Sequence, residues 1–461
     1  MSLRRIGLGL MAALAAFGLV TQTSMPAMAQ NTGVQPAGVE ISPEGVLRTL
    51  TVADPTGTLT RTRMAEARSR VDGDAMRHSE LRKVSLVRLE EAIRERVEAG
   101  RPLTPEMLSL AGLTEIRYVF YYPETQDIVL AGPAEGFFED VTGRTVGIET
   151  GKATLQLEDL VVALRTFAPG ESRSTVIACS IDPTQEGLAA MQQFLANVNF
   201  RGLGDAPRIA DGLKQSLGLQ TVTLQGVPGS SHFAQVLVEA DYRMKLIGIG
   251  LERPAAEIRS YVAIANPAEV RANALARWYF TPNYDCVRVS EDRNAMELVG
   301  SRVRLIGEDE RVTNDGVRVA EGRRHNRASI AFTEGFTKQY DALATNSPVF
   351  AQLRNCMDLA IAAAYIQQQD FYGQSGWNMD LLQDESIVNV ERLVEPQQVE
   401  TAVNAVLKGN QLVTPIGGGV QIEAHRAIDP ARVQVDQQGE LSRAQGSVDP
   451  AAVDVNRWWW D

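Results

Sequence analysis

Cysteine and histidine are scarce in this sequence. Its 461 residues include three cysteines, Cys179, Cys286 and Cys356. A small scaffold held together by disulfides is therefore excluded, and at most one intramolecular bridge can form, which leaves one thiol over. The sequence has no Cys-x-x-Cys pair and no His-Glu-x-x-His helix, so the common zinc signatures are missing. The four histidines lie far apart in sequence, at His78, His232, His325 and His425.

Other motifs that carry chemistry are missing as well. There is no phosphate-binding G-x-x-x-x-G-K-[ST] loop, no G-x-S-x-G nucleophile turn and no Ser-x-x-Lys pair. The acidic segment 308–316 resembles a calcium loop only faintly, because Arg311 and Thr313 fall where ligands belong. We therefore expect no metal ion and no cofactor.

Positive charge is in deficit. Lys and Arg together number 45 against 57 Asp and Glu, which gives a formal net charge of −12. A general nucleic-acid binder or a binder of anionic membranes needs positive surface, and no run of Lys and Arg supplies it locally. Both classes of protein are excluded on this ground.

Long apolar runs are absent, apart from Ile6 to Val20, which is about fifteen residues and too short for a spanning helix. Arg4 and Arg5 precede this run, and Ala27-Met28-Ala29 follows it as a small-x-small cleavage site. This order is typical of a secretory signal peptide over residues 1–29. We expect the mature protein to begin at Gln30, to lie in the periplasm or outside the cell, and to have no transmembrane segment.

The rest of the sequence interleaves helix and strand patterns and predicts an α+β (mixed α/β) fold. We expect an N-terminal extension with a helical arm over 30–111, a mixed α/β core domain over 112–395 and a flexible tail over 396–461. The tail is rich in Gln, Val, Asp and Pro and lacks a sustained periodic pattern.

Within the core, residues 116–122 alternate as a strand, and Pro123 to Gln126 turns the chain into a hairpin. Strand–helix alternation over 174–244 predicts an α/β unit with some parallel pairing, with Asp182 as the N-cap of a helix. Short β runs over 286–320 predict an antiparallel sheet after this unit. Two helices close the core, the second apolar nearly all round at 349–365, so we expect Cys356 to be a buried free thiol.

Several segments of the core resemble a family of exported planctomycete proteins that carry a domain of unknown function. The resemblance spans roughly 115–377 and implies an exported bacterial protein. It implies no activity and no catalytic residues. It is carried by YVFYYPETQDIVLAGP at 118–133, CSIDPTQEGL at 179–188, FAQVLVEADYRMKLIGIGLE at 233–252, RWYFTPNYDCVRVSEDRNAMELV at 277–299 and FAQLRNCMDLAIAAAYI at 350–366.

One arrangement of residues can carry catalysis. Cys179 ends a predicted strand just before a helix, where a helix N-terminus lowers a thiol pKa. His232 begins another helix and can act as its base, oriented by Asp182 or Asp241. The alternatives are that Cys179 packs in the core or pairs with Cys286 in a disulfide, and that His232 caps its helix.

Charged and aromatic side chains offer two further interpretations. Arg243 and Lys245 can face an anionic ligand or form the solvated side of an amphipathic helix. The triplet Trp458-Trp459-Trp460 can dock on its own body or bind an envelope protein partner, since three adjacent Trp side chains are costly to leave in water.

The sequence therefore favours an exported, non-catalytic binding or structural component of the cell envelope. The alternative is a thiol-dependent or other hydrolytic enzyme that uses Cys179 and His232. A polar cleft joining these two residues would favour the enzyme, whereas a closed core would not.

Overall fold

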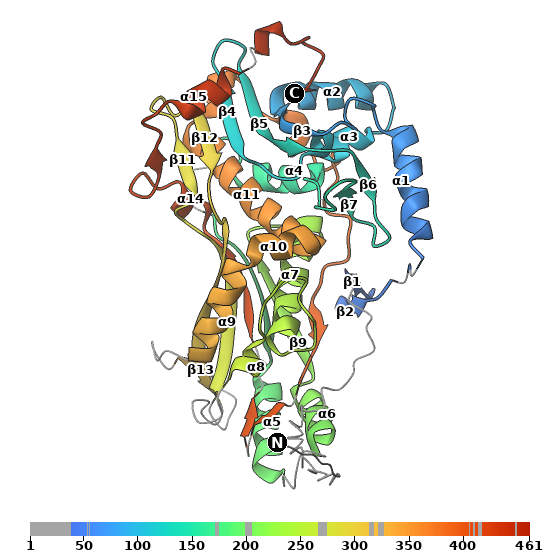
Figure 1. The fold of residues 1–461 in the computed structure, drawn as a ribbon, viewed down its shortest axis with the longest axis vertical. Coiled ribbons are helices and arrows are strands. Elements are labelled where there is room, and N and C mark those ends of the chain that lie inside the picture. Colours follow the sequence, from blue (N-terminus) through green and yellow to red (C-terminus); the bar gives the residue numbers. More distant parts are fainter. Residues whose placement is uncertain are drawn as a thin grey trace, which may run out of the picture. The chain divides into compact units, whose positions relative to one another are not determined.

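Two mixed β-sheets organise the chain (Figure 1). The computed structural model describes residues 38–52, 54, 56–170, 175–198, 205–265, 274–312, 318–320, 327–404, 406–408, 411–413, 417–447 and 450–461. Among these residues, nine strands form the larger sheet, in the order β1 (Gly38–Ile41), β2 (Val46–Leu50), β15 (Gln398–Glu400), β9 (Leu219–Gln225), β8 (Ile177–Pro183), β18 (Gly418–Ile422), β10 (Ala274–Pro282), β13 (Val303–Val312) and β14 (Arg318–Ala320). Its β2–β15 and β10–β18 pairs are parallel, and its other pairs are antiparallel.

The second sheet has seven described strands. Their order is β19 (Gln434–Val435), β11 (Val287–Val289), β12 (Ala295–Leu298), β4 (Tyr118–Tyr122), β5 (Asp127–Ala134), β3 (Ser79–Ser85) and β20 (Trp459–Trp460). Two smaller pairs join β6 (Phe137–Glu139) to β7 (Thr145–Gly147) and β16 (Val406–Lys408) to β17 (Gln411–Val413). The α+β fold class is thereby confirmed, and so is the hairpin of β4 and β5, in which Tyr122 pairs with Asp127.

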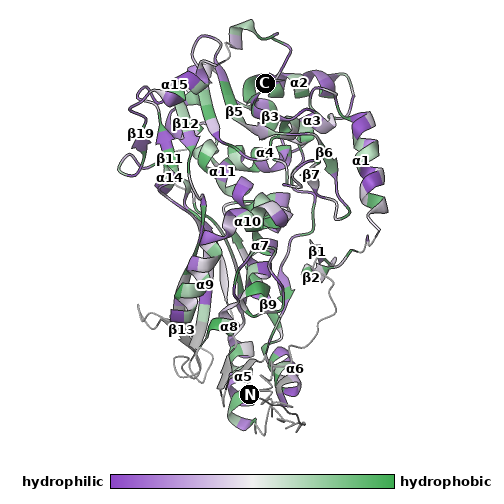
Figure 2. Cartoon of the chain, viewed as in Figure 1, coloured by the Kyte–Doolittle hydropathy of each residue, from purple (hydrophilic) through white to green (hydrophobic). Residues whose placement is uncertain are grey.

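Helices pack against both sheets. The longer ones in the described part are α1 (Thr58–Arg70), α2 (Leu86–Glu98), α4 (Leu157–Thr166), α5 (Gln185–Asn197), α6 (Ala206–Leu217), α7 (His232–Gly248), α9 (Arg327–Lys338) and α11 (Pro348–Gln368). The shorter ones are α3 (Pro105–Leu108), α8 (Tyr261–Ile264), α10 (Tyr340–Asn346), α12 (Phe371–Ser375), α13 (Asp380–Gln383), α14 (Ala424–Ala427) and α15 (Glu440–Gln445). In Figure 2, purple hydrophilic residues are prominent along α1, which buries no residue.

Helix α11 is the central helix that the sequence predicts. All residues from Val349 to Ile366 are buried, among them Cys356, which is a free thiol as expected. Helix α2 lies within the segment 30–111 for which a helical arm is expected, and the Ser85 hydroxyl caps it by accepting from the Arg88 amide at 3.2 Å. Both predictions hold because the pattern of apolar side chains is regular over several turns.

The unit around β8 differs from the expectation. β8 and β9 pair antiparallel, because α5 and α6 between them form a helical hairpin that returns the chain to the same end of the sheet. Leu188 and Met191 of α5 pack with Leu213 and Leu217 of α6. The helix after β8 is capped by Thr184, which accepts from the Gly187 amide at 3.0 Å, so the prediction of an Asp182 cap is wrong.

The short β runs after residue 286 do not make a sheet of their own. β11 and β12 extend the seven-stranded sheet beside β4, whereas β13 and β14 extend the nine-stranded sheet beside β10. The chain thus moves from one sheet to the other within a few residues, between β12 and β13. Strand periodicity does not reveal which sheet a strand joins, since that depends on partners far away in sequence.

The prediction of a flexible tail is wrong where the structure describes it. β15 and β18 lie inside the nine-stranded sheet, and β18 pairs with β8 on one side and β10 on the other. A Cβ on Gly418, whose φ is 151°, would lie 2.3 Å from the Trp278 carbonyl oxygen. Gly418 thus lets the strand approach β10 closely. Runs of three to five residues were too short to read as strands from the sequence.

The Trp triplet is docked on its own body. Trp459 and Trp460 form β20, which pairs with Val84 and Lys83 of β3. The three residues are 8%, 7% and 3% exposed. The interpretation of Trp458 to Trp460 as an exposed partner-binding anchor is therefore corrected, because the rings are already covered.

Arg82 explains how the triplet docks. Its side chain is fully buried, and its guanidinium lies over the Trp459 ring at 4.7 Å from the ring centroid. The same group donates to the side chain of Asp461 at 2.8 Å and to carbonyl oxygens that include those of Ala75 and Ala111. Burial of Arg82 therefore depends on the end of the chain. Asp461 accepts its hydrogen bonds, and the Trp459 ring covers its guanidinium.

Replacing Trp459 with Ala should lower the free energy of unfolding by about 3–5 kcal/mol, because a buried ring and a cation–π contact are lost. Urea unfolding followed by circular dichroism measures this change. The matched control is Val455→Ala, four residues earlier and 76% exposed, which should stay within about 0.5 kcal/mol of the parent protein. Equal stability of both variants would contradict the docking of the triplet.

Candidate functional site

Besides Tyr242, helix α7 carries five titratable side chains through the interior of the protein. Three of them, Glu239, Asp241 and Arg243, are buried, and Lys245 is nearly so. His232 begins the helix and is partly exposed. The interpretation of this run as a solvated helix face is wrong, and each charge has to be compensated by other elements.

One side of α7 belongs to a chain of polar contacts. His232 Nδ1 lies 3.0 Å from both carboxylate oxygens of Asp159 on α4. Its Nε2 lies 3.3 Å from the amide nitrogen of Gln352 on α11. The oxygen of the Gln352 side chain accepts from Arg144 Nε at 3.0 Å. Helices α4, α7 and α11 are joined through these side chains.

These polar contacts continue along α7 through two hydrogen-bonded ion pairs. Arg144 Nη2 donates to both carboxylate oxygens of Glu239, at 2.6 and 2.5 Å. Glu239 also lies 3.6 Å from Arg243, one turn further along the helix. Arg243 in turn donates to Glu252 through Nε at 3.0 Å and Nη2 at 2.6 Å. We call the residues joined by these contacts the α7 network: Arg144, Asp159, His232, Glu239, Arg243, Glu252 and Gln352.

The protonation of His232 is set by two neighbours that act in opposite directions. Burial disfavours the charged ring, but the Asp159 carboxylate raises the pKa of His232 to about 9. Arg144 has only N–H donors, so it turns the Gln352 oxygen toward itself and the amide nitrogen toward Nε2, which favours the neutral ring. A hydrogen bond to a charged group contributes about 1.5–3 kcal/mol and a neutral hydrogen bond about 1 kcal/mol, so the effect of Asp159 prevails.

The other side of α7 faces a separate group of charges. Lys245 Nζ donates to Asp241 Oδ2 at 3.0 Å and to the Ile181 carbonyl at 2.8 Å. Burial raises the pKa of Asp241 to about 6, although Lys245 acts to lower it. Asp182 pairs with Arg277 at 3.0 Å. Both candidate orienting residues, Asp182 and Asp241, are therefore engaged by basic side chains.

Cys179 lies beside these charges and not beside His232. Burial raises the pKa of Cys179 well above its usual value, and Asp241 raises it further. Asp241 follows His232 by nine residues, which is roughly 13 Å along a helix axis. The partners of His232 are Asp159 and Gln352. The structure therefore does not bring Cys179 and His232 together as a nucleophile and its base.

The three cysteines are buried free thiols, so the disulfide considered between Cys179 and Cys286 is not formed. Cys179 belongs to β8 of the nine-stranded sheet, whereas Cys286 directly precedes β11 of the seven-stranded sheet. Burial raises the pKa of Cys286 to about 12, and it raises the pKa of Cys356 well above its usual value. None of the three thiols is poised to ionise at neutral pH.

A further buried group of charges lies along the middle of α11, around Arg354 and Asp358. Glu115 Oε2 lies 2.7 Å from Arg302 and 3.3 Å from Arg354, and Asp358 lies 3.1 Å from Arg302. Burial raises the pKa of Asp358 to about 7, against the lowering effect of the two guanidinium groups. These ion pairs join α11 to the segments that precede β4 and β13, so their role is structural.

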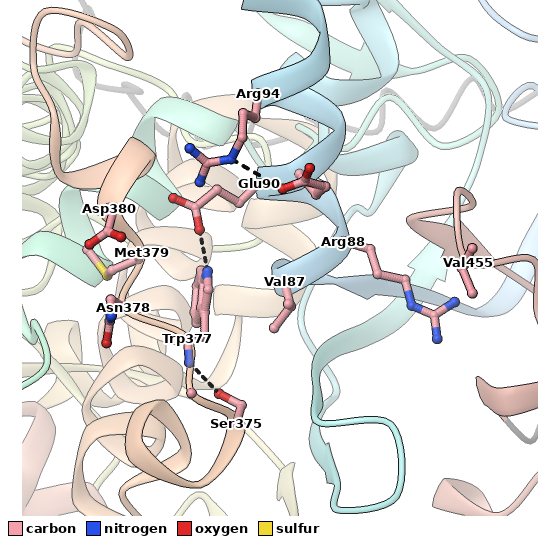
Figure 3. A pocket seen from close by; sticks show the side chains of 12 residues that line it. Val87, Arg88, Glu90, Arg94, Ser375, Trp377, Asn378, Met379, Asp380 and Val455 are labelled. Atoms are coloured by element: carbon pink, nitrogen blue, oxygen red, sulfur yellow. Dashed lines mark hydrogen bonds and ion pairs between the residues drawn. The ribbon is translucent and has the colours of Figure 1, made fainter.

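Two cavities border these elements. A cavity of about 160 Å³ lies against the Arg144 and Arg243 end of the α7 network. A larger pocket of about 380 Å³ lies between α2 and α13, where Glu90 points to the Trp377 indole nitrogen (Figure 3). Glu90 also accepts from the Leu381 and Leu382 amides at 2.7 and 3.0 Å, so its carboxylate holds the start of α13 in place.

The described part of the chain shows neither a metal-binding cluster nor a membrane-spanning helix. There, no group of three or more His, Cys, Asp or Glu side chains is arranged to hold a metal ion. None of the described helices has the length and the apolar character of a membrane span.

Replacing Asp159 with Asn should remove a pH dependence of stability. The raised pKa of His232 means that its ion pair stabilises the fold fully below pH about 6.5 and loses that effect as the pH rises through about 9. The parent protein should therefore lose up to about 3 kcal/mol of unfolding free energy over this window. Urea unfolding at a series of pH values measures the change.

Without the Asp159 carboxylate, burial lowers the pKa of His232, and this loss between pH 7 and 9 should disappear in Asp159→Asn. The control variant is Glu158→Gln, which removes the adjacent carboxylate and should keep most of the slope. An unchanged slope in Asp159→Asn would contradict the assignment of His232 as a charged partner of Asp159.

Comparisons with known proteins reach only part of the chain. A family model described as a protein of unknown function (DUF1598) matches residues 179–261. This span runs from β8 to the first residue of α8 and includes the whole of α7. It lies within the region of 115–377 that carries the family resemblance. No curated protein and no solved structure matches the chain.

Proposed function

We propose that this chain is an exported, non-catalytic binding protein of the bacterial cell envelope. Support for export comes from the residues that precede Gln30. Arg4 and Arg5, the uncharged run that follows and the Ala27-Met28-Ala29 site have the order of a signal peptide. The resemblance to exported planctomycete proteins supports the same location.

The pairing of charges on α7 beside a cavity is the observation that carries the binding role. Each charged side chain of α7 already has a partner of opposite charge, as in the Arg243–Glu252 and Lys245–Asp241 pairs. Groups held in this way are fixed in position and preorganised to recognise a ligand. They are poorly suited to donate or accept a proton in a reaction, because doing so would break a buried ion pair.

The alternative of a hydrolase that uses Cys179 and His232 has less support. A nucleophilic cysteine needs a lowered pKa and a base within hydrogen-bond reach. Burial and the nearby Asp241 raise the pKa of Cys179, and His232 is engaged by Asp159 and Gln352.

The proposed binding role does not involve the Trp triplet as an anchor, since the three rings are already covered by the protein itself.

The export part of the proposal predicts a processed protein in the envelope fraction of the native cell. N-terminal sequencing of that protein should read from Gln30. The control is a variant with Ala27→Glu and Ala29→Glu, which removes the small residues of the cleavage site and should leave the precursor uncut. Folded protein in the cytoplasm that still begins at Met1 would refute this part.

The non-catalytic part predicts three unreactive thiols. Iodoacetamide at pH 7.5 should modify no cysteine of the native protein and all three after unfolding in guanidinium, because burial keeps each thiol protonated and covered. Intact mass spectrometry counts the adducts. Rapid modification of Cys179 alone in the native protein would favour the hydrolase instead, and a Cys179→Ala variant identifies the site of that modification.

A further inference from the structure

The larger pocket lies between α2 and the loop that leads into α13 (Figure 3). One wall is the face of α2 that carries Val87, Glu90, Glu91 and Arg94, and the other is the loop 375–380. We call it the Glu90 pocket. Its volume of about 380 Å³ lies within the range of pockets that hold small molecules, which begins near about 300 Å³. It shares no residue with the α7 network.

The carboxylate of Glu90 is buried without a cationic partner. Glu90 is 4% exposed, and among the described residues its oxygens accept only from neutral donors. These donors are the indole N–H of Trp377 and the backbone amides of Leu381 and Leu382, at 2.7 and 3.0 Å. A buried carboxylate is costly unless an opposite charge accompanies its hydrogen bonds.

The charges that line the Glu90 pocket do not balance. They belong to Arg88, Glu90, Glu91, Arg94 and Asp380. Arg88 is neutralised from outside the pocket by Asp127 at 2.7 Å, and Arg94 pairs with Glu91 at 3.2 Å. Asp380 is exposed and forms no ion pair with any described residue. Two carboxylates therefore remain without a basic partner, and the pocket favours a cation.

Glu90 also keeps an unused hydrogen-bond acceptor. A carboxylate offers about four acceptor positions. Oε1 uses two of them for the Leu381 and Leu382 amides, and Oε2 uses one for the Trp377 indole. The position that is left is on Oε2. A ligand that fills it has to donate a hydrogen bond, and an ammonium group does so while it supplies the missing positive charge.

Trp377 makes an organic cation more suitable than a metal ion. Its indole lines the Glu90 pocket and stacks on Tyr372 at 5.6 Å between ring centroids. Aromatic rings attract ammonium groups, and Val87 offers apolar surface to a hydrocarbon stem. No group of three or more metal-ligating side chains occurs in the described part of the chain. An amine thus matches the wall of the pocket as well as its charge.

We propose that the Glu90 pocket binds the primary ammonium group of an organic amine, with Glu90 Oε2 and the Asp380 carboxylate as its acceptors. The Trp377 ring lies beside the ammonium group. This site is distinct from the α7 cavity that supports the proposed binding role, so the inference goes beyond that function.

Calorimetric titration of the purified protein with cadaverine at low ionic strength tests the proposal. Cadaverine should bind saturably at one site, and pentanediol, the neutral compound of the same chain length, should not bind. Fully N-methylated cadaverine keeps the charge but donates no hydrogen bond, so it should bind about tenfold more weakly. Absence of saturable cadaverine binding overturns the proposal, as does equal binding of the diol or of the methylated compound.

Three variants locate the site by the direction of their effects. Glu90→Gln should weaken cadaverine binding about ten- to hundredfold, as expected for a lost charge-assisted hydrogen bond. Asp380→Asn should weaken it about two- to fivefold, and Arg94→Gln should strengthen it by a similar factor, because a repelling charge is removed. The matched control is Glu95→Gln, an exposed carboxylate of α2 outside the pocket, which should leave the affinity unchanged.

The opposite signs separate ligand binding from a structural role. Glu90 also holds the start of α13, so Glu90→Gln alone can act through the fold, as a lower melting temperature would show. Asp380 and Arg94 make no such contact. Changes of the same sign in Asp380→Asn and Arg94→Gln overturn the proposal, as does equal weakening by Asp380→Asn and Glu95→Gln. The proposed function is tested separately, by the processed N-terminus and by thiol reactivity.

Discussion

Burial of charge along α7 is the constraint on which the arrangement of its neighbours depends. A charge taken out of water destabilises the fold by several kcal/mol unless an opposite charge and hydrogen bonds replace the solvent. Glu239 therefore requires Arg144 from the turn before β7, and Arg243 requires Glu252 beyond the helix. Asp241 requires Lys245 on the helix itself. Helix α7 can be buried only when each of its charges meets its partner. The ion pairs therefore fix both the rotation of α7 about its axis and its position along that axis.

The same pairing explains why the candidate chemistry of the chain is one of recognition. In the α7 network, the carboxylates of Asp159, Glu239 and Glu252 are each held at a fixed distance by a basic side chain. The DUF1598 match covers α7 and Glu252, whereas Arg144 and Gln352 lie outside it. The α7 network is thus completed by segments that lie outside the matched span.

The sequence could predict what depends on regular local patterns. The α+β class, the β4–β5 hairpin and the buried α11 all follow from apolar periodicity over many residues. It could not predict that residues 418–422 join a sheet, because their partners lie in β8 and β10. The glycines are explained only by the close approach of Gly418 and Gly419 to the carbonyl oxygens of Trp278 and Cys179. The site shows the same limit. The sequence offers His232 as a base for Cys179, yet its partners in the structure are Asp159 and Gln352, to which no sequence pattern links it.

The position of β18 has a consequence for how the protein reaches its native state. This strand lies between β8 and β10 but follows both of them in the chain. Until residues 418–422 are available, β8 and β10 each present an open edge, and the sheet cannot close. Contacts between segments so distant in sequence form slowly. The export that we propose would benefit from this delay, because the topology itself postpones folding until most of the chain has crossed the membrane.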